Sequence, residues 1–179
     1  NRALVINALC DDSIPITNVS DCDDTRVMKQ AFTKKNSSID IHGAGTAMRF
    51  LTAYNAQKRD YECIISGSER MKQRPIKILV DALRSLGADI RYVDKEGFPP
   101  LQIFGKELRG GELSLPGNVS SQYISALLMI APYMQNGLEL TLTGNIVSTP
   151  YLEMTLEMMS HFGIETHRSN NTIRVPAGR

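Results

Sequence analysis

The 179-residue sequence has few cysteines, no long apolar run and no excess of charge of either sign. Its three cysteines show no CxxC spacing, so we expect no disulfide framework and a reducing, cytoplasmic environment. No apolar run approaches the roughly 18 residues of a membrane helix, which argues against a membrane partner. A net charge of +1 argues against nucleic acid or another polyanion as partner. The three histidines are scattered, so we expect no metal site.

Helical and strand-like periods alternate along the chain, and the hydrophobic fraction of 42% is ordinary for a globular domain. The periodicity predicts helices over 2–11, 22–34, 45–56, 74–87, 120–134 and 150–162. It predicts strands over 14–19, 38–41, 61–66, 89–93, 100–104, 112–115, 138–143, 164–168 and 172–175. We expect a final hairpin turn at 169–171.

An internal repeat connects two parts of the chain. A strand, a glycine, a proline-started helix and a further glycine occur twice, with Gly67 matching Gly144 and Pro75 matching Pro150. Residues 1–41 resemble a third, shorter copy. The first, third and fifth predicted helices are apolar on almost all sides and must be buried. We therefore expect these helices inside and the sheets outside.

The residues with the clearest chemical potential collect at predicted helix starts. Arg2 opens the first helix, and the segments 42–49 and 117–122 open two others. Segments 68–75 and 147–151 precede amphipathic helices. Helix N-termini, glycines and arginines together suit phosphate and carboxylate groups. If the repeats run parallel, these starts share one surface, and a small, doubly anionic ligand would bind there.

Each of these features also has a purely structural interpretation. The glycine-rich turn can be only a turn, and Ser120, Ser121 and Ser148 can be N-caps. The basic residues of 70–77 can be a solvated face, and Tyr151 can be a core residue or a stacking wall. Neither a Ser/His/Asp order nor a Walker A sequence is present, so the residues indicate no nucleophile and no nucleotide loop.

Five motifs, in this order, resemble signatures of the 5-enolpyruvylshikimate-3-phosphate (EPSP) synthases. They are Asn1–Leu4, Ala44–Arg49, Arg70–Ile76, Val119–Tyr123 and Val147–Tyr151. The resemblance implies an α/β (α+β) fold, an inverse αβ domain of three βαβαββ-type repeats with buried helices inside and sheets outside. It also implies that residues 1–179 are a single shikimate-3-phosphate-binding domain, truncated at both ends from a two-domain enzyme.

The resemblance implies a transferase of the shikimate pathway, which serves chorismate and aromatic amino acid biosynthesis. Such enzymes move the enolpyruvyl group of phosphoenolpyruvate to the 5-hydroxyl of shikimate-3-phosphate and release phosphate. They need no cofactor and no metal, and we expect the full-length enzyme to be a monomer. The second domain of the family carries an acidic base and further basic residues. We therefore assign no catalytic residue to this half and expect it to be inactive alone.

The resemblance also assigns site residues by motif. The residues implied for shikimate-3-phosphate are Arg2, Ser120, Ser121, Gln122, Ser148 and Tyr151. Those implied for phosphoenolpyruvate are Gly45, Arg70 and Gln122, with Thr46 and Arg49 shaping the loop.

Several positions depart from the family pattern. His42-Gly43 stands where the family usually has Gly-Asn, and Phe50 where it has Pro, so the response to the inhibitor glyphosate stays open. Residues 34–41 form a short segment, from which we expect a hairpin to be missing, and the Lys-Ser pair expected before Asn1 is absent.

Two alternative functions stay open. One is a UDP-N-acetylglucosamine enolpyruvyl transferase domain, although that family uses a cysteine on a mobile loop and Cys63 lies in an apolar strand. The other is a non-enzymatic anion- or RNA-binding repeat module, against which the near-neutral charge argues.

Overall fold

A computed structural model describes residues 1–12, 14–33 and 37–178. The helices are α1 (Arg2–Leu9), α2 (Asp23–Thr33), α3 (Gly45–Ala56), α4 (Glu69–Lys72), α5 (Lys77–Ser85), α6 (Ser121–Ile130), the 3-10 turn η1 (Ala131–Tyr133) and α7 (Thr149–His161). The strands are β1 (Ser38–Asp40), β2 (Tyr61–Ser66), β3 (Asp89–Tyr92), β4 (Leu101–Gly105), β5 (Gly111–Pro116), β6 (Leu138–Thr143), β7 (His167–Ser169) and β8 (Thr172–Val175). None of the helices in these ranges is long and apolar enough to cross a membrane.

The strands form two sheets with the same architecture. Their orders are β1-β2-β4-β3 and β5-β6-β8-β7. In each sheet the first pair is parallel and the other two pairs are antiparallel. Each unit therefore runs βαβαββ, which confirms the repeat expected from the sequence. In the described part of the chain, the third unit contributes α1 and α2 without a sheet of its own.

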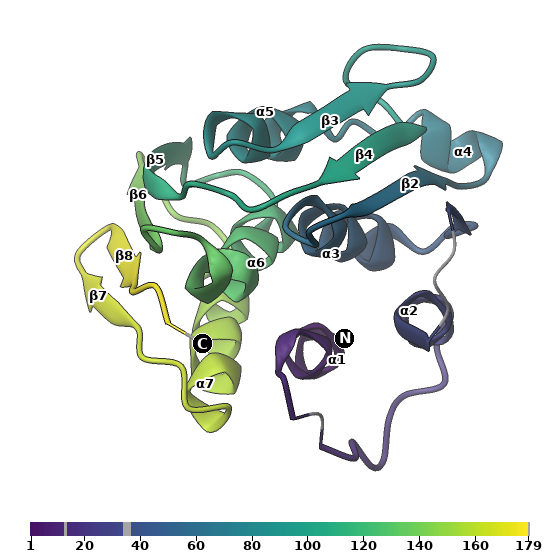
Figure 1. The fold of residues 1–179 in the computed structure, drawn as a ribbon. Coiled ribbons are helices and arrows are strands. Elements are labelled where there is room, and N and C mark those ends of the chain that lie inside the picture. The colour runs from purple at the N-terminus through teal and green to yellow at the C-terminus, as the bar shows by residue number, and fades with distance from the viewer. Residues whose placement is uncertain (13, 34–36, 179) are drawn as a thin grey trace.

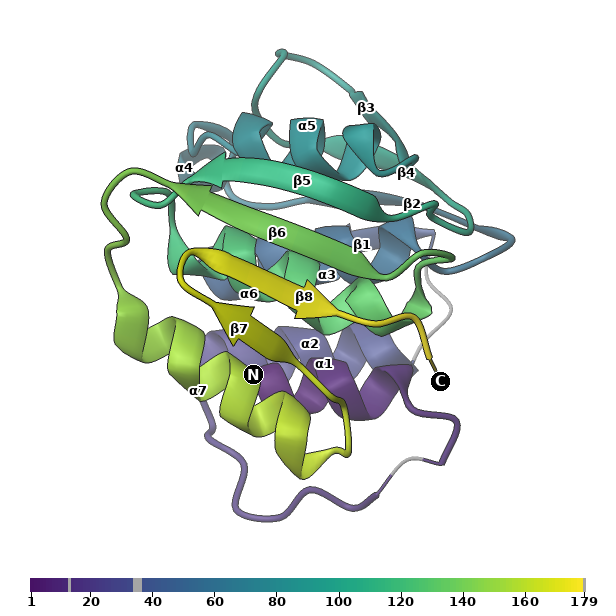
Figure 2. The same ribbon diagram turned by 90° about the vertical axis from the view of Figure 1, so that its left-hand side faces the viewer.

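The apolar helices lie inside and the sheets outside, as expected. Ten of the twelve residues of α3 are buried, as are eight of the ten residues of α6. Figure 1 shows the first sheet above α3, and Figure 2 shows the second sheet in front of α6. Helix α1 is less buried than the other two apolar helices, because only its Val5, Ile6 and Leu9 are buried.

The strand predicted over 14–19 was wrong. Among the described residues, no strand pairs with this segment, which is a loop without regular structure. The Asn7 side chain of α1 makes the hydrogen bonds that a neighbouring strand would make. Its Nδ2 donates to Ile14 O at 3.0 Å, and its Oδ1 accepts from Ile14 N at 2.8 Å. A backbone pair that a sheet would satisfy is thus satisfied by one amide.

The helix predicted over 74–87 is present as α5, which is shorter at both ends. The structure has the four-residue α4, which ends before Pro75, and α5, which begins at Lys77. The Ser68 hydroxyl caps α4 by accepting from Met71 N at 3.3 Å. Pro75 lacks an N–H and disfavours helical backbone in the residue before it, so the two helices cannot join.

Other boundaries moved for similar reasons. The helix predicted over 120–134 tightens into η1 at Pro132, which has no N–H for the α-helical pattern. The strand predicted over 164–168 begins later and extends one residue further as β7, so the hairpin turn expected at 169–171 is confined to residues 170–171. The missing hairpin was expected within 34–41, of which residues 34–36 lie outside the described residues.

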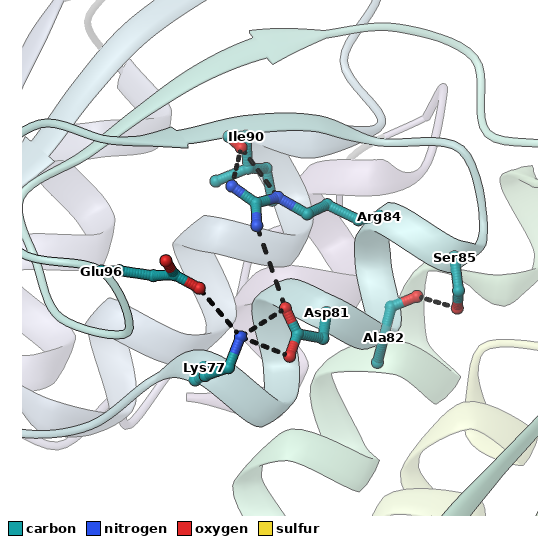
Figure 3. Close-up of polar contacts among 7 residues, drawn as sticks. All are labelled: Lys77, Asp81, Ala82, Arg84, Ser85, Ile90 and Glu96. Carbon is teal, nitrogen blue, oxygen red and sulfur yellow. Dashed lines mark hydrogen bonds and ion pairs between the residues drawn. The ribbon is translucent and has the colours of Figure 1, made fainter.

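Polar contacts fasten α5 to the loop after β3 (Figure 3). Lys77 Nζ lies 3.0 Å from Asp81 Oδ2 and 3.2 Å from Glu96 Oε1. Arg84 donates to Ile90 O through Nη2 at 2.7 Å and Nε at 3.0 Å. These half-exposed ion pairs stabilise by less than about 1 kcal/mol each, and Lys77 connects the start of α5 to the loop after β3.

Candidate functional site

The starts of three helices meet at one edge of the molecule. Gln122 in the first turn of α6 donates from Nε2 to Thr46 Oγ1 in the first turn of α3, at 3.0 Å. The Tyr123 hydroxyl of α6 donates to Pro75 O, just before α5, at 2.8 Å. In Figure 2, β5 and β6 point to this edge, and α7 begins there. The expected convergence of helix N-termini is therefore present.

Two arginines crowd the first residue of α3. A Cβ built on Gly45 would lie 2.3 Å from Arg74 Nη1 and 3.1 Å from Arg49 Nη1. Arg49 is 6% exposed and donates from Nη1 to Gly45 O at 2.9 Å, while its Nε has no partner among the described residues. Burial, and secondarily the charge of Arg74, lower the pKa of Arg49. Because both guanidinium groups lie beside Gly45, their like charges repel each other and favour an anion at this position.

Arg70 belongs to the same corner. Gly43, Ser68, Arg70, Met71 and Arg74 line a pocket of about 450 Å³. Both arginines come from the segment around α4, which the break at Pro75 turns back toward α3. A larger pocket, of about 510 Å³, lies at the far ends of α1 and α7 and contains none of the expected site residues.

Arg2 forms a second corner with α6 and α7. Its Nε donates to Thr155 Oγ1 at 2.7 Å, and its Nη2 donates to Ser125 Oγ at 3.2 Å. The guanidinium carbon lies over the rings of Phe50 and Tyr151, 5.7 and 6.0 Å from their centroids. Burial lowers the pKa of Arg2. The group still carries its charge at neutral pH, because its ordinary pKa is far higher.

The three serines differ in how they are used. The Ser120 hydroxyl caps α6 by accepting from Gln122 N at 3.3 Å, as the structural interpretation expected, and Ser121 is the first residue of that helix. Ser148 stands at the N-cap position of α7 but makes no capping hydrogen bond. Its backbone is left-handed, with φ of 61°, which a residue other than glycine rarely adopts. Such strain is typical of functional positions.

The site arginines share an electrostatic property. Arg2, Arg49, Arg70 and Arg74 form no ion pair with any carboxylate of the described residues, and neither do Arg109 and Arg174, whereas the other arginines of these ranges each do. Asp24 lies near the start of α3, where its Oδ1 accepts from Ala47 N at 2.8 Å, but it forms no ion pair with the site arginines. Within the same described ranges, no group of His, Cys, Asp or Glu side chains could hold a metal ion. The arrangement can bind small anions.

Sequence reasoning assigned no ligand to three residues of this site. Arg74 lies within the Arg70–Ile76 motif and directly before a proline at a helix start, but it was assigned to neither substrate. Ser125 and Thr155 lie inside largely apolar helices, and no local pattern connects either of them to Arg2. Only the packing of α1, α6 and α7 brings them together.

Comparisons with known proteins agree on one family. The family model of EPSP synthase (3-phosphoshikimate 1-carboxyvinyltransferase) matches residues 29–178. A 3-phosphoshikimate 1-carboxyvinyltransferase of Bacteroides fragilis (strain YCH46) is 61% identical over 163 residues, which are 91% of this chain and 40% of that protein. One of Haemophilus influenzae (strain Rd) is 41% identical over 193 residues, covering 92% of this chain and 45% of that protein.

The fold has a solved counterpart. A structure of EPSP synthase from Acinetobacter baumannii superposes with a TM-score of 0.84 at 20% identity, covering 99% of this chain and 44% of that chain. At this identity the likeness concerns the fold alone. The chain spans 40–45% of the length of the relatives it matches.

Proposed function

From the premise that this chain belongs to the EPSP synthase family, we propose that residues 1–179 are the shikimate-3-phosphate-binding domain of a longer, two-domain enzyme. That enzyme would transfer the enolpyruvyl group of phosphoenolpyruvate to the 5-hydroxyl of shikimate-3-phosphate, giving EPSP and phosphate. The observation that carries the proposal is the set of four arginines at the helix starts that have no carboxylate partner in the described part of the chain. Both substrates are anions, and each would supply the missing negative charge.

The corner of Arg2 suits shikimate-3-phosphate. Arg2 and the Tyr151 ring offer a charged donor beside an aromatic wall for the substrate ring. Ser120, Ser121 and Ser148, at the starts of α6 and α7, offer hydroxyl and backbone donors for its phosphate. Of these three, the Ser148 hydroxyl is the most available to the phosphate, because it makes no capping hydrogen bond.

The corner of Gly45 suits phosphoenolpyruvate. Arg74 and Arg49 approach Gly45 closely, and Arg70 shares a pocket with Arg74. We therefore add Arg74 to the residues expected to bind this substrate. Gln122 donates to Thr46 in the first turn of α3 and begins the helix that carries Ser125, the partner of Arg2, which supports a contact with both ligands. Fixed donors of this kind stabilise charge that develops during the reaction without reorganising.

The proposed enzyme has a second domain, binds two small-molecule substrates and acts in the cytoplasm. It uses neither a cofactor nor a metal, and it is a monomer. The compartment is supported by the cysteines, all of which are free in the described ranges. Half of a cleft lacks the proximity and charge that catalysis needs. The isolated chain should therefore be inactive and should bind shikimate-3-phosphate weakly if at all.

Cys63, the cysteine considered for the alternative enolpyruvyl transferase, does not support that function. Cys63 is 1% exposed in β2, and burial raises its pKa to about 12, so its thiol stays protonated at neutral pH. A thiol in that state cannot act as a nucleophile or acid on a mobile loop.

Calorimetric titration separates the candidates. The longer enzyme should bind shikimate-3-phosphate, and it should bind neither UDP-N-acetylglucosamine nor RNA. Binding of either of the latter two in place of shikimate-3-phosphate contradicts the proposal. Measurable turnover by purified residues 1–179 would show that this half is sufficient and would contradict the two-domain division.

A further inference from the structure

A pair of hydroxyls buried between α6 and α7 contacts Arg2. Ser125 and Thr155 are both 0% exposed, and their oxygens lie 2.8 Å apart. They lie in helices whose other buried residues are mostly apolar. A buried hydroxyl without a hydrogen-bond partner costs free energy, so the groups that these two bond decide what they do.

The direction of each hydrogen bond in this cluster follows from counting protons. The Thr155 hydroxyl donates to Tyr151 O at 2.8 Å, one turn back in α7. Its oxygen can therefore only accept from its other neighbours, Arg2 Nε and the Ser125 hydroxyl. Ser125 gives its proton to Thr155 and accepts from Arg2 Nη2. Both hydroxyls thus act as acceptors for Arg2, and neither can turn away.

This network leaves one end of the guanidinium available. The planar group carries five N–H donors in a rigid fork. Its Nε and one Nη2 donor are bonded to the hydroxyl pair. None of the described residues accepts a hydrogen bond from Nη1. Because the group is rigid, fixing one edge fixes the direction of the free end, and the nearby rings of Phe50 and Tyr151 restrict it further.

We propose that Ser125 and Thr155 are positioning residues that aim Arg2 at shikimate-3-phosphate. The inference rests on the proposed function and adds to it two residues that touch no substrate. A flexible arginine must lose rotamer freedom when a ligand binds, whereas one that is already held loses little. The hydroxyl pair thus raises affinity for one of the two substrates.

The decisive variant is Thr155→Val in the longer enzyme, because valine keeps the shape and removes the hydroxyl. The KM for shikimate-3-phosphate should rise about tenfold, as expected for one lost hydrogen bond to a charged group. The KM for phosphoenolpyruvate should stay within about twofold, because its corner does not contact Thr155. Thr155→Ser, which keeps the hydroxyl, should restore the KM for shikimate-3-phosphate to within about twofold of the wild type.

Thr52→Val is the matched control. Thr52 is 0% exposed in α3 and donates to Met48 O at 2.7 Å, the same bond to the preceding turn that Thr155 makes. It does not contact Arg2. Both valine variants should lose thermal stability, but only Thr155→Val should change the KM for shikimate-3-phosphate. An equal change in both variants, or no change in either, overturns the positioning role.

A measurement without substrate separates this role from the proposed function. In ligand-free enzyme, the NMR signal of the Arg2 Nε–H should be protected from solvent exchange. It should lose that protection in Thr155→Val and keep it in Thr52→Val. Unprotected Arg2 in active wild-type enzyme overturns the positioning role. An enzyme that neither binds nor converts shikimate-3-phosphate, whatever the state of Arg2, overturns the proposed function instead.

Discussion

Two arginines of the site are held in different ways, and the difference concerns single residues. Arg49 donates to a backbone carbonyl of its own helix, Gly45 O, and is almost fully buried. Arg2 donates to side chains of α6 and α7, which come from distant parts of the chain. Arg49 therefore depends on the start of α3, whereas Arg2 depends on how α1, α6 and α7 pack.

The first prediction concerns Gly45→Ala. The added methyl would lie 2.3 Å from Arg74 Nη1, so the Arg74 side chain must move away from the start of α3. In the longer enzyme, the KM for phosphoenolpyruvate should rise about tenfold, while that for shikimate-3-phosphate changes little. Gly43→Ala adds a methyl with no atom within 4 Å and should raise the same KM less. The reverse ranking would contradict the placement of Arg74.

The second prediction concerns Ser148, whose backbone is left-handed. Ser148→Gly and Ser148→Ala both remove the hydroxyl, so both should weaken binding of shikimate-3-phosphate in calorimetry. Only alanine keeps the unfavourable conformation, so the glycine variant should be more stable by about 1 kcal/mol in urea unfolding. Unchanged affinity in both variants would show that the Ser148 hydroxyl does not bind the ligand.

At the scale of elements, the start of α2 changes the chemistry of a cysteine. Cys22 lies directly before α2, exposed, with its sulfur 3.3 Å from Thr25 Oγ1. Hydrogen bonds from the Thr25 side chain, the Thr25 backbone and the Ser20 side chain lower the pKa of Cys22 to about 7. Burial instead raises the pKa values of Cys10 and Cys63. Three thiols in one chain thus have different reactivities.

The third prediction follows from these pKa directions. Iodoacetamide at pH 7 should alkylate Cys22 before Cys10 and Cys63, because the thiolate is the reacting form. The rate should rise with pH to a half-maximum near pH 7, the pKa of the Cys22 thiol. Thr25→Val should move that midpoint upward, since it removes a stabilising hydrogen bond. Mass spectrometry of the labelled peptides measures both effects, and initial labelling at Cys10 would contradict the prediction.

Most elements could be predicted because their signals are local. The bounds of α3, β2, β6 and β8 match the expected ranges residue for residue, where periodicity and flanking turns agree. The helix predicted over 74–87 is present as α5 but begins three residues later, because Pro75 lacks an N–H and disfavours helical backbone in the residue before it. The strand predicted over 14–19 was wrong for a different reason. The segment 14–19 has strand composition, but a strand also requires a neighbour, and its own sequence does not reveal that none is present.

The candidate site was predictable to a similar degree. Residues at helix starts, such as Arg2, Gly45 and Gln122, were named because motif and helix end coincide in sequence. Arg74 was named within a motif but assigned to no ligand, and Ser125 and Thr155 were not named, because their roles depend on close approach between distant segments. Local sequence patterns predict which hydrogen-bond donors lie at helix starts. They do not predict which buried side chains accept hydrogen bonds from those donors.

At the scale of the whole molecule, arginines that form no ion pair among the described residues gather at one edge, and their charge gives the fourth prediction. Inorganic phosphate at about ten times its dissociation constant should raise the Tm of the chain by about 3 °C, through binding to the folded state alone. Sodium chloride at equal ionic strength should raise it less. The shift should shrink in Arg74→Ala and persist in Arg26→Ala, whose arginine pairs with Asp23 outside the site. Equal shifts in both variants would contradict an anion site at the helix starts.

The repeated strand order also has a historical meaning. Helices α3 and α6 begin 76 residues apart, at Gly45 and Ser121, in equivalent places of two units with one topology. A gene segment encoding such a unit, once duplicated, yields two equivalent helix starts from a single ancestor. One copy is now surrounded by arginines and the other by serines. Under the proposed function, two substrates would bind side by side at descendants of one element, each altered without loss of the other.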